Sequence, residues 1–189
     1  MNAAAKVAQQ VLGTEPTNLS HNYKEHPTEK MKACRWQAAA KVSLDEVPAP
    51  MITDPKDVIL HVTGTTVCGS DLHIYHKDLL QQKSGMILGH EFCGIVADVG
   101  PGVTKFKKGD RVVSSFQIAC GDCDMCRRGL TSMCDKTNDS TVQARLYGGK
   151  FGGIFGYTDF TGGYAGGQAE QVRVPFADSN LLKIPDNIP

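Results

Sequence analysis

The sequence Cys120-Gly-Asp-Cys123-Asp-Met-Cys126, followed after seven residues by Cys134, organises the middle of this chain. Four thiolates on one loop, spaced in this way, can enclose a zinc ion tetrahedrally at Zn–S distances of about 2.3 Å without ligands from elsewhere. Four sulfur ligands leave no coordination position open for a substrate. The pattern therefore predicts a structural zinc lobe over about residues 118–136.

Three other interpretations of these cysteines fit the sequence less well. The run C-x2-C-x2-C also occurs in ferredoxins, but there the next gap is shorter and a proline follows, whereas here Asp135 follows Cys134. A zinc ribbon that binds nucleic acid has two C-x2-C pairs separated by about 15–20 residues and a basic face, and this sequence has neither. Reduced cysteines in a core have no reason to follow metal-ligand spacing. Zinc is therefore preferred.

Length, charge and cysteine content narrow the classes of protein to which this chain can belong. The chain has 189 residues, the length of one ordinary domain, with 20 Lys+Arg against 20 Asp+Glu. A net charge of zero argues against nucleic acid or an anionic membrane surface as partner, and no run approaches the roughly 18 apolar residues of a membrane span. Seven cysteines form a poor disulfide framework, and the first thirty residues lack an export signal. We therefore expect a reducing, cytoplasmic location.

Several short β-rich runs separated by turns predict a mainly β fold with short helices, either a barrel or a sandwich. The expected strands are a hairpin of 32–37 and 41–47, then 57–67, 92–99, 111–115 and 169–174. A short helix is expected over 70–80, capped by Ser70 or Asp71. Residues 1–30 are expected to form a disordered extension, and residues 31–189 one domain. Long amphipathic helices between the strands are missing, which argues against a doubly wound parallel sheet.

A second group of metal-binding residue types lies in two separate segments, Cys68-Gly-Ser70-Asp71-Leu-His73 and Gly89-His90-Glu91. A catalytic zinc takes three protein ligands and keeps one position for substrate, so Cys68 and His90 are candidate ligands. The hydroxyl of Ser70 is a candidate acceptor for a substrate proton, which His73 would carry outward. Asp71 and Glu91 are candidates for orienting His90 or approaching the metal.

The residues of this second group can also be interpreted without a metal site. Cys68 as a buried apolar residue and His90 as a hydrogen-bonded core histidine would explain the same residues without a metal. A Cys–His nucleophile pair would need an oxyanion hole and an orienting partner, and no motif marks either.

The order of these motifs resembles the zinc-containing medium-chain alcohol dehydrogenases, and the resemblance runs from about Met31 to Pro189. The segments most similar to the formaldehyde dehydrogenase-like branch are Phe155-Gly-Tyr, Gly166-Gly-Gln-Ala-Glu170 and Val174-Pro-Phe-Ala-Asp-Ser-Asn-Leu-Leu182. The resemblance implies a GroES-like, partly open β-barrel that carries a catalytic and a structural zinc.

The resemblance also implies a role for each matching residue. Cys68 and His90 would be catalytic zinc ligands, with Glu91 near the metal. Ser70 and His73 would form a proton relay, and Asp71 would be the acidic partner of the ligand histidine. The structural zinc ligands would be Cys120, Cys123, Cys126 and Cys134. In the family, the third catalytic ligand, a cysteine or aspartate, falls downstream of Pro189.

Family members continue with a Rossmann domain for the nicotinamide cofactor, whereas no G-x-G-x-x-G spacing occurs in this sequence. Cofactor-binding residues are therefore not assigned. The glycine-rich stretch 148–167 lacks a phosphate-loop pattern and is expected to be an irregular surface or substrate-side loop.

Two functions follow as hypotheses. The first is the N-terminal catalytic-domain portion of a zinc- and NAD(P)-dependent dehydrogenase of small alcohols or aldehydes, inactive without its cofactor domain and a possible homo-oligomer through parts outside this chain. The second is a stand-alone zinc-binding barrel that is not an enzyme and associates with full-length subunits.

Overall fold

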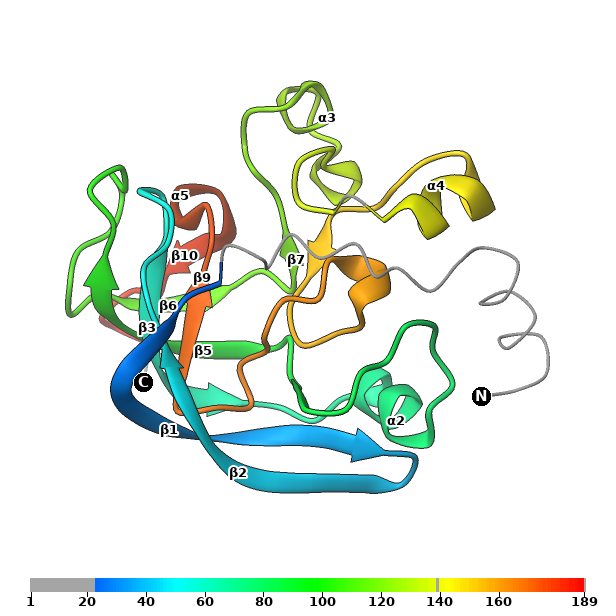
Figure 1. The fold of residues 1–189 in the computed structure, drawn as a ribbon. Helices are drawn as coiled ribbons and strands as arrows, with labels where there is room; N and C mark the ends of the chain where they lie inside the picture. The colour runs from blue at the N-terminus through cyan, green and yellow to red at the C-terminus, as the bar shows by residue number, and fades with distance from the viewer. Residues whose placement is uncertain (1–22, 139, 189) are drawn as a thin grey trace.

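The computed structural model describes residues 23–138 and 140–188, and strands dominate it (Figure 1). The strands are β1 (Glu25–Ala38), β2 (Lys41–Pro50), β3 (Val58–Thr65), β4 (Met86–Ile87), β5 (Phe92–Val99), β6 (Arg111–Ser114), β7 (Gln117–Ile118), β8 (Gly153–Ile154), β9 (Gln171–Val174) and β10 (Leu181–Lys183). The helices are α2 (Gly69–His76), α3 (Asp124–Arg127), α4 (Thr141–Tyr147) and α5 (Ala177–Asn180), with 3-10 turns η2 (Thr131–Met133) and η3 (Asp159–Thr161). The prediction of a mainly β fold with short helices is confirmed.

The strands form three antiparallel sheets with the orders β2-β1-β4, β10-β6-β5-β3-β9 and β7-β8. Backbone hydrogen bonds join the first sheet to the segment that enters β9: Cys34 N–H donates to Gln168 O at 2.8 Å, and Glu170 N–H donates to Lys32 O at 3.0 Å. The sheets therefore wrap around a common interior, but the described strands do not close into a complete barrel. This is the partly open form that the resemblance implies.

The hairpin of β1 and β2 turns at Ala40, which has a φ of 57°, and pairs Cys34 with Leu44. It confirms the hairpin expected at 32–37 and 41–47. Strand β1 begins at Glu25, so the boundary expected at Met31 falls inside a strand. Residues 1–22 of the expected extension lie outside the described residues.

The core lies on the inner face of the five-stranded sheet. Alternate residues of β3 and β9, among them Val58, Leu60 and Val172, are almost completely buried. The rings of Phe92 and Phe155 meet edge to face there, with centroids 5.2 Å apart. Burying each side chain of this size stabilises the fold by about 1.5–3 kcal/mol.

The helix expected over 70–80 is α2, and the expected cap is wrong: its N-cap is Cys68 rather than Ser70 or Asp71. Of the two alternatives for the glycine-rich stretch, a surface loop or a substrate-side loop, the first does not hold for its second half, where Phe155 and Gly156, for example, are buried. Glycines without side chains allow this segment to pass close to neighbouring backbone, and a pattern of apolar residues cannot reveal such packing.

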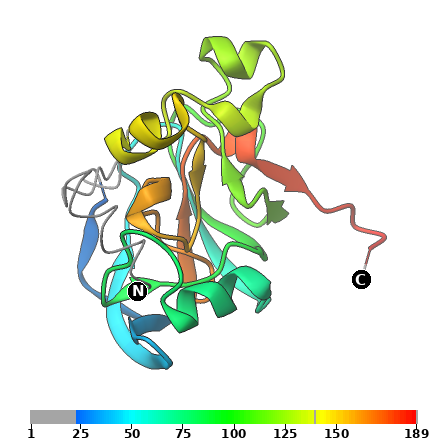
Figure 2. The same cartoon turned by 90° about the vertical axis from the view of Figure 1, so that its right-hand side faces the viewer.

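The sequence did not predict α4 or β10. Strand β10 adds to the edge of the five-stranded sheet through β6, and the residues after it extend away from the body of the molecule in Figure 2. None of the helices in the described ranges is long and apolar enough to cross a membrane.

Candidate metal centres

The four lobe cysteines lie in the segment that runs from the end of β7 to the residue after η2, and they converge around the short helix α3 at the top of Figure 1. Sγ atoms lie 3.9 Å apart in both the Cys120–Cys126 and the Cys123–Cys134 pair, and all four lie within 4.8 Å of one another. In a tetrahedron with Zn–S bonds of about 2.3 Å, neighbouring sulfurs are about 3.8 Å apart. The donor set therefore fits a structural zinc ion.

Backbone groups of the lobe already favour thiolates. Cys123 N–H donates to Cys120 Sγ at 3.3 Å, and Cys126 N–H donates to Cys123 Sγ at 3.5 Å. Burial opposes ionisation of Cys123, but backbone N–H donors, those of Cys126 and Asp135, outweigh it and lower its pKa to about 6. Burial and a hydrogen bond with Cys123 instead raise the pKa of Cys126 to about 12. A cation bound among the four sulfurs would favour the thiolate form of each.

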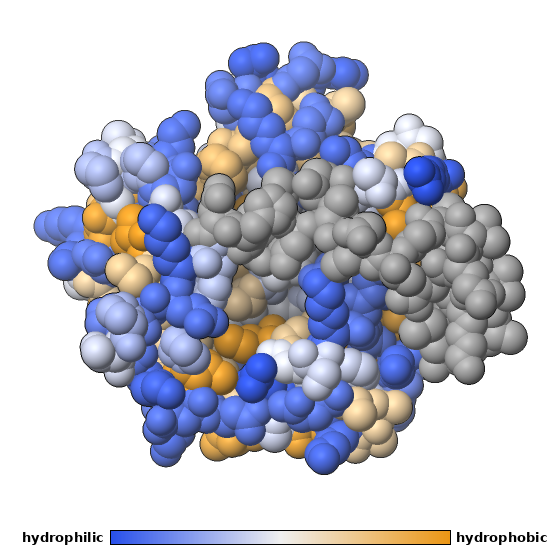
Figure 3. All heavy atoms as spheres, viewed as in Figure 1, coloured by the Kyte–Doolittle hydropathy of each residue, from blue (hydrophilic) through white to orange (hydrophobic). Residues whose placement is uncertain are grey.

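The surface of the lobe is balanced in charge. Asp122 lies 3.6 Å from Arg127 and 3.3 Å from Lys136, and Asp124 lies 3.4 Å from Arg128. Each basic side chain near α3 therefore has an acidic neighbour, although such exposed pairs contribute only about 0–1 kcal/mol. In Figure 3 this lobe is mostly hydrophilic, while hydrophobic residues gather in smaller areas below it.

The second centre brings together residues from two segments far apart in the sequence. Cys68 caps the start of α2, and His90 directly precedes the segment that enters β5. Cys68 Sγ lies 3.2 Å from His90 Nε2, and one ligand atom each of Cys68, His90 and Glu91 lie within 4.8 Å of one another. Zinc bonds of about 2.3 Å to sulfur and about 2.0 Å to nitrogen place such atoms roughly 3.5 Å apart. These residues fit a zinc ion with an open position.

Glu91 reaches this centre from the exposed side. Its carboxylate accepts a hydrogen bond from the hydroxyl of Thr66, and Thr66 N–H donates to Glu91 O at 3.1 Å. Thr66 therefore holds both the backbone and the side chain of Glu91 close to Cys68 and His90.

Asp71 contacts Cys68 rather than His90. Its Oδ2 accepts the Cys68 N–H at 2.9 Å, and its carboxylate is buried. Neither Asp71 Oδ1 nor His90 Nδ1 has a hydrogen-bond partner among the described residues. The carboxylate thus fixes the backbone of one candidate ligand, and the hydrogen bond to the other that was expected from the resemblance is not present in this structure.

Ser70 and His73 lie one helical turn apart on α2. Ser70 is half-buried, whereas the His73 side chain is 65% exposed and its Nδ1 lies 3.6 Å from Asp78 Oδ2. The pair therefore runs from the neighbourhood of Cys68 toward solvent, the direction that a proton relay requires.

Two aromatic residues that sequence reasoning missed flank His90. The rings of Tyr157 and Phe116 stand edge-on to the imidazole, with centroids 6.1 and 6.2 Å from it. Burial raises the pKa of Tyr157, and the negative charges of Cys68 and Asp71 raise it further. Phe116 lies in no motif, and Tyr157 was named only within the Phe155-Gly-Tyr resemblance, because the proximity of both rings to His90 depends on packing.

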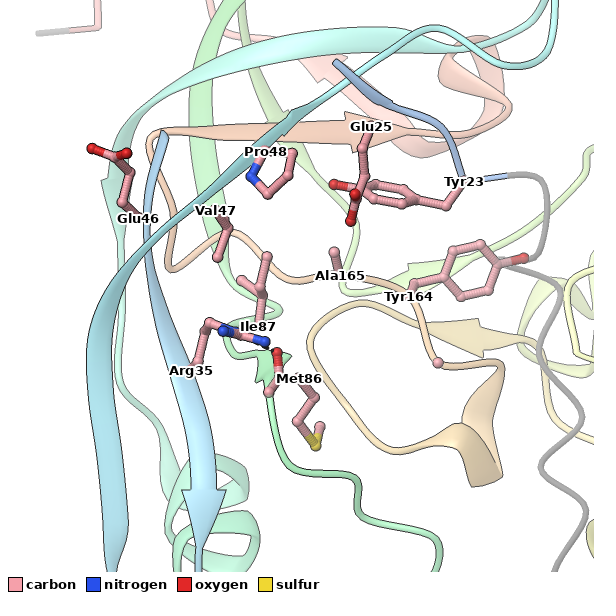
Figure 4. Close-up of a pocket in the computed structure, with 12 residues that line it drawn as sticks. Tyr23, Glu25, Arg35, Glu46, Val47, Pro48, Met86, Ile87, Tyr164 and Ala165 are labelled. Carbon is pink, nitrogen blue, oxygen red and sulfur yellow. Dashed lines mark hydrogen bonds between the residues drawn. The ribbon is translucent and has the colours of Figure 1, made fainter. Parts of the chain in front are cut away.

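A cavity of about 570 Å³ opens beside His90 and Glu91, and it is lined mainly by apolar atoms. Phe116 and Val113 form part of its wall. Such a hollow next to a metal-binding group suits the hydrocarbon part of a small substrate. A second cavity, of about 380 Å³, lies between the β1–β2 hairpin and β4 (Figure 4) and contains none of the candidate metal ligands.

The sequence of residues 54–186 matches the family model of the alcohol dehydrogenase GroES-like domain. The chain belongs to this family. It is 49% identical over 160 residues to a zinc-type alcohol dehydrogenase-like protein of Schizosaccharomyces pombe, covering 84% of this chain and 38% of that protein. It is 40% identical over 152 residues to a glutathione-independent formaldehyde dehydrogenase of Pseudomonas aeruginosa, covering 77% of this chain and 35% of that protein.

Among solved structures, the alcohol dehydrogenase TADH from Thermus sp. ATN1 superimposes with a TM-score of 0.74 at 38% identity, covering 84% of this chain and 41% of that one. The predicted resemblance to the N-terminal part of zinc-containing medium-chain alcohol dehydrogenases is confirmed. The chain spans about two fifths of the length of these proteins or less.

Proposed function

We propose that this chain is the N-terminal catalytic-domain portion of a zinc- and NAD(P)-dependent dehydrogenase that acts on small alcohols or aldehydes. The observation that carries the proposal is the 3.2 Å approach of Cys68 Sγ and His90 Nε2 beside a largely apolar cavity. Family membership supports the reaction class, since the matched relatives are named alcohol and formaldehyde dehydrogenases.

Cys68 and His90, with Glu91, would hold the catalytic zinc, and the third ligand of the family would come from outside this chain. When bound, zinc supplies Lewis-acid polarisation of a substrate oxygen. The cavity wall at Phe116 holds the hydrocarbon part of the substrate and excludes water from it. Asp71 keeps Cys68 in place through its backbone N–H.

The proton leaves by way of α2. The Ser70 hydroxyl accepts it from the substrate hydroxyl while giving up its own proton toward His73, one turn further on. His73 then releases a proton to solvent, where its side chain is exposed. NAD or NADP, held by a cofactor domain, would supply the hydride acceptor, and turnover by residues 1–189 would require that domain. Cys120, Cys123, Cys126 and Cys134 bind a structural zinc that holds the lobe together.

The test is the zinc content of the purified chain, measured by inductively coupled plasma mass spectrometry. We expect about two zinc ions per chain in the wild type and about one in Cys68→Ser. Cys93→Ser is the matched control, because Cys93 is also a half-buried free thiol but belongs to neither centre. About one zinc in the wild type, unchanged in Cys68→Ser, would refute the catalytic metal site.

A second candidate function is a zinc-binding barrel that associates with full-length subunits without acting as an enzyme. It is favoured by apolar side chains left exposed beside the cavity, Val113, Phe116 and Leu182, the last 70% exposed. Size-exclusion chromatography of the chain with a full-length relative, together with dehydrogenase assays of each, separates the two. Association without activity supports this candidate, and turnover that depends on an added cofactor domain supports the first.

The chain works in the reducing environment of the cytoplasm, which its free thiols favour, and its enzyme assembles as a homo-oligomer through parts outside this chain. Its ligands are small molecules rather than nucleic acid or membrane, in keeping with the zero net charge.

A further inference from the structure

The glycine-rich segment binds the backbone that leads into His90. Two N–H groups of this segment and that of the residue directly after it donate to carbonyl oxygens of 87–89: Gly166 to Ile87 at 3.1 Å, Gly167 to Gly89 at 2.9 Å and Gln168 to Leu88 at 2.9 Å. Figure 4 shows Ala165, the residue before Gly166 in the sequence, close to Ile87. The residues immediately before His90 are therefore held to a segment more than seventy residues away in the sequence.

The approach is so close that side chains are excluded from it. A Cβ on Gly166 would lie 2.2 Å from the carbonyl oxygen of Leu88 and 2.3 Å from that of Gly89. A Cβ on Gly156, whose φ is 54°, would lie 2.4 Å from both the nitrogen and the oxygen of Gly89. Carbon and oxygen atoms of different residues normally stay at least about 3.3 Å apart. Glycine at these positions is therefore required by contact with the backbone before His90.

The same segment also supplies side chains around the centre. Tyr157, next to Gly156, places its ring edge-on to His90 at 6.1 Å. Gln168 Nε2 donates to Thr66 O at 3.0 Å, and the Thr66 hydroxyl in turn donates to Glu91. Both candidate ligands of the second segment, His90 and Glu91, thus depend on this stretch for their surroundings.

We propose that Gly156, Gly166 and Gln168 form a clasp that positions the second segment for metal binding: backbone contacts hold the residues before His90, and the Gln168 side chain holds Thr66, which binds Glu91. The glycine-rich segment then acts on the catalytic centre without touching metal or substrate. The inference deepens the proposed function and rests on it, because holding His90 Nε2 within 3.2 Å of Cys68 Sγ is useful only where both ligate a metal. Groups that orient metal ligands typically contribute 10–100-fold to metal affinity.

Cobalt(II) titration of the purified chain tests the clasp, with the four-cysteine lobe as internal reference. Gly166→Ala is compared with Gly149→Ala, a change in the same segment where a Cβ would meet nothing within 4 Å. We expect Gly166→Ala to weaken binding of the second cobalt by about tenfold or more while the first, at the lobe, binds as in the wild type. Gly149→Ala should bind both normally. Unchanged second-site affinity in Gly166→Ala would overturn the clasp.

If Gly166→Ala binds no cobalt at the lobe either, that variant has failed to fold, and Gln168→Ala is used in its place. It removes a side chain instead of adding one, so overpacking is avoided, and we expect weaker binding of the second cobalt with the lobe site intact. Equal affinity to wild type in this variant would then contradict the proposal.

The clasp can also be tested when no metal is bound at the second site, so that failure of the clasp can be told apart from failure of the proposed function. If the wild type binds only the lobe cobalt, the proposed catalytic site fails in this chain. Proton NMR contacts between the His90 and Tyr157 rings, recorded with zinc in the lobe, then decide the clasp. They should be present in the wild type and in Gly149→Ala and lost in Gly166→Ala. Contacts retained in Gly166→Ala would count against it.

Discussion

Asp57 and Arg173 form an ion pair inside the fold, where Arg173 of β9 reaches the residue that precedes β3. The Arg173 Nη1–Asp57 Oδ2 distance is 2.9 Å, and the two side chains are 7% and 0% exposed. Asp57 Oδ2 also accepts hydrogen bonds from the N–H and hydroxyl of Thr53 and from the N–H of Asp54. Replacing Asp57 with alanine leaves these donors and a buried guanidinium without their acceptor.

The cost follows from that burial. Removing one partner of a buried, hydrogen-bonded pair typically costs about 3–5 kcal/mol, because the remaining charge stays out of water uncompensated. A domain of this kind is stable by about 5–15 kcal/mol in total. With a urea m-value of about 2 kcal/mol/M, we expect Asp57→Ala to lower the unfolding midpoint by roughly 1.5–2.5 M.

Urea unfolding of the zinc-loaded chain, followed by circular dichroism, measures this change. Adding Arg173→Met to Asp57→Ala should recover at least about 1 kcal/mol, since the unpaired charge is gone. Asp98→Ala is the control, because it breaks a pair with Lys108 of similar length, 2.8 Å, in which both side chains are more than half exposed. Its cost should stay below about 1 kcal/mol. A midpoint for Asp57→Ala equal to that of Asp98→Ala would refute the reasoning.

Two further predictions concern pH and catalysis. A hydrogen bond from Lys183 and another from the backbone of Lys107 hold the pKa of Asp110 below its ordinary value. The folded state therefore favours the ionised carboxylate, and the wild type should be more stable than Asp110→Asn. This difference in stability should be complete above about pH 4 and disappear as the pH falls further. Unfolding midpoints measured from pH 7 to pH 2 check this, and an advantage that grows on acidification would contradict it. In the proposed dehydrogenase with its cofactor domain, Ser70→Ala should lower kcat by about 10²–10⁴-fold with zinc content unchanged, whereas replacement of an exposed serine outside the centre, Ser179→Ala, should not. Full activity of Ser70→Ala in steady-state assays would exclude the relay.

Some strands could be predicted from the sequence because their own residues and the turns beside them determine where they begin and end. Strand β5 spans the residues expected for it, since a β-branched run ends there at a Gly-Pro-Gly turn. Strands of two or three residues, such as β7 and β10, could not be predicted, because pairing with a neighbour decides whether so short a run is extended. Helix α4 was missed although Ser140 caps its start and Gly148 its end, because it has only seven residues and buries only Val142 and Gln143.

The sequence by itself determined the composition of the cysteine lobe, because all four candidate ligands lie within fifteen residues and their spacing alone limits how they can meet. It also identified the family and named Cys68 and His90. Only the tertiary structure decided that these two side chains meet at 3.2 Å, that Asp71 holds Cys68 rather than His90, and that glycines clasp the backbone before His90. Contacts between distant segments depend on how closely backbones pack, and a glycine, which has no side chain, leaves no trace of that packing in a hydrophobic pattern.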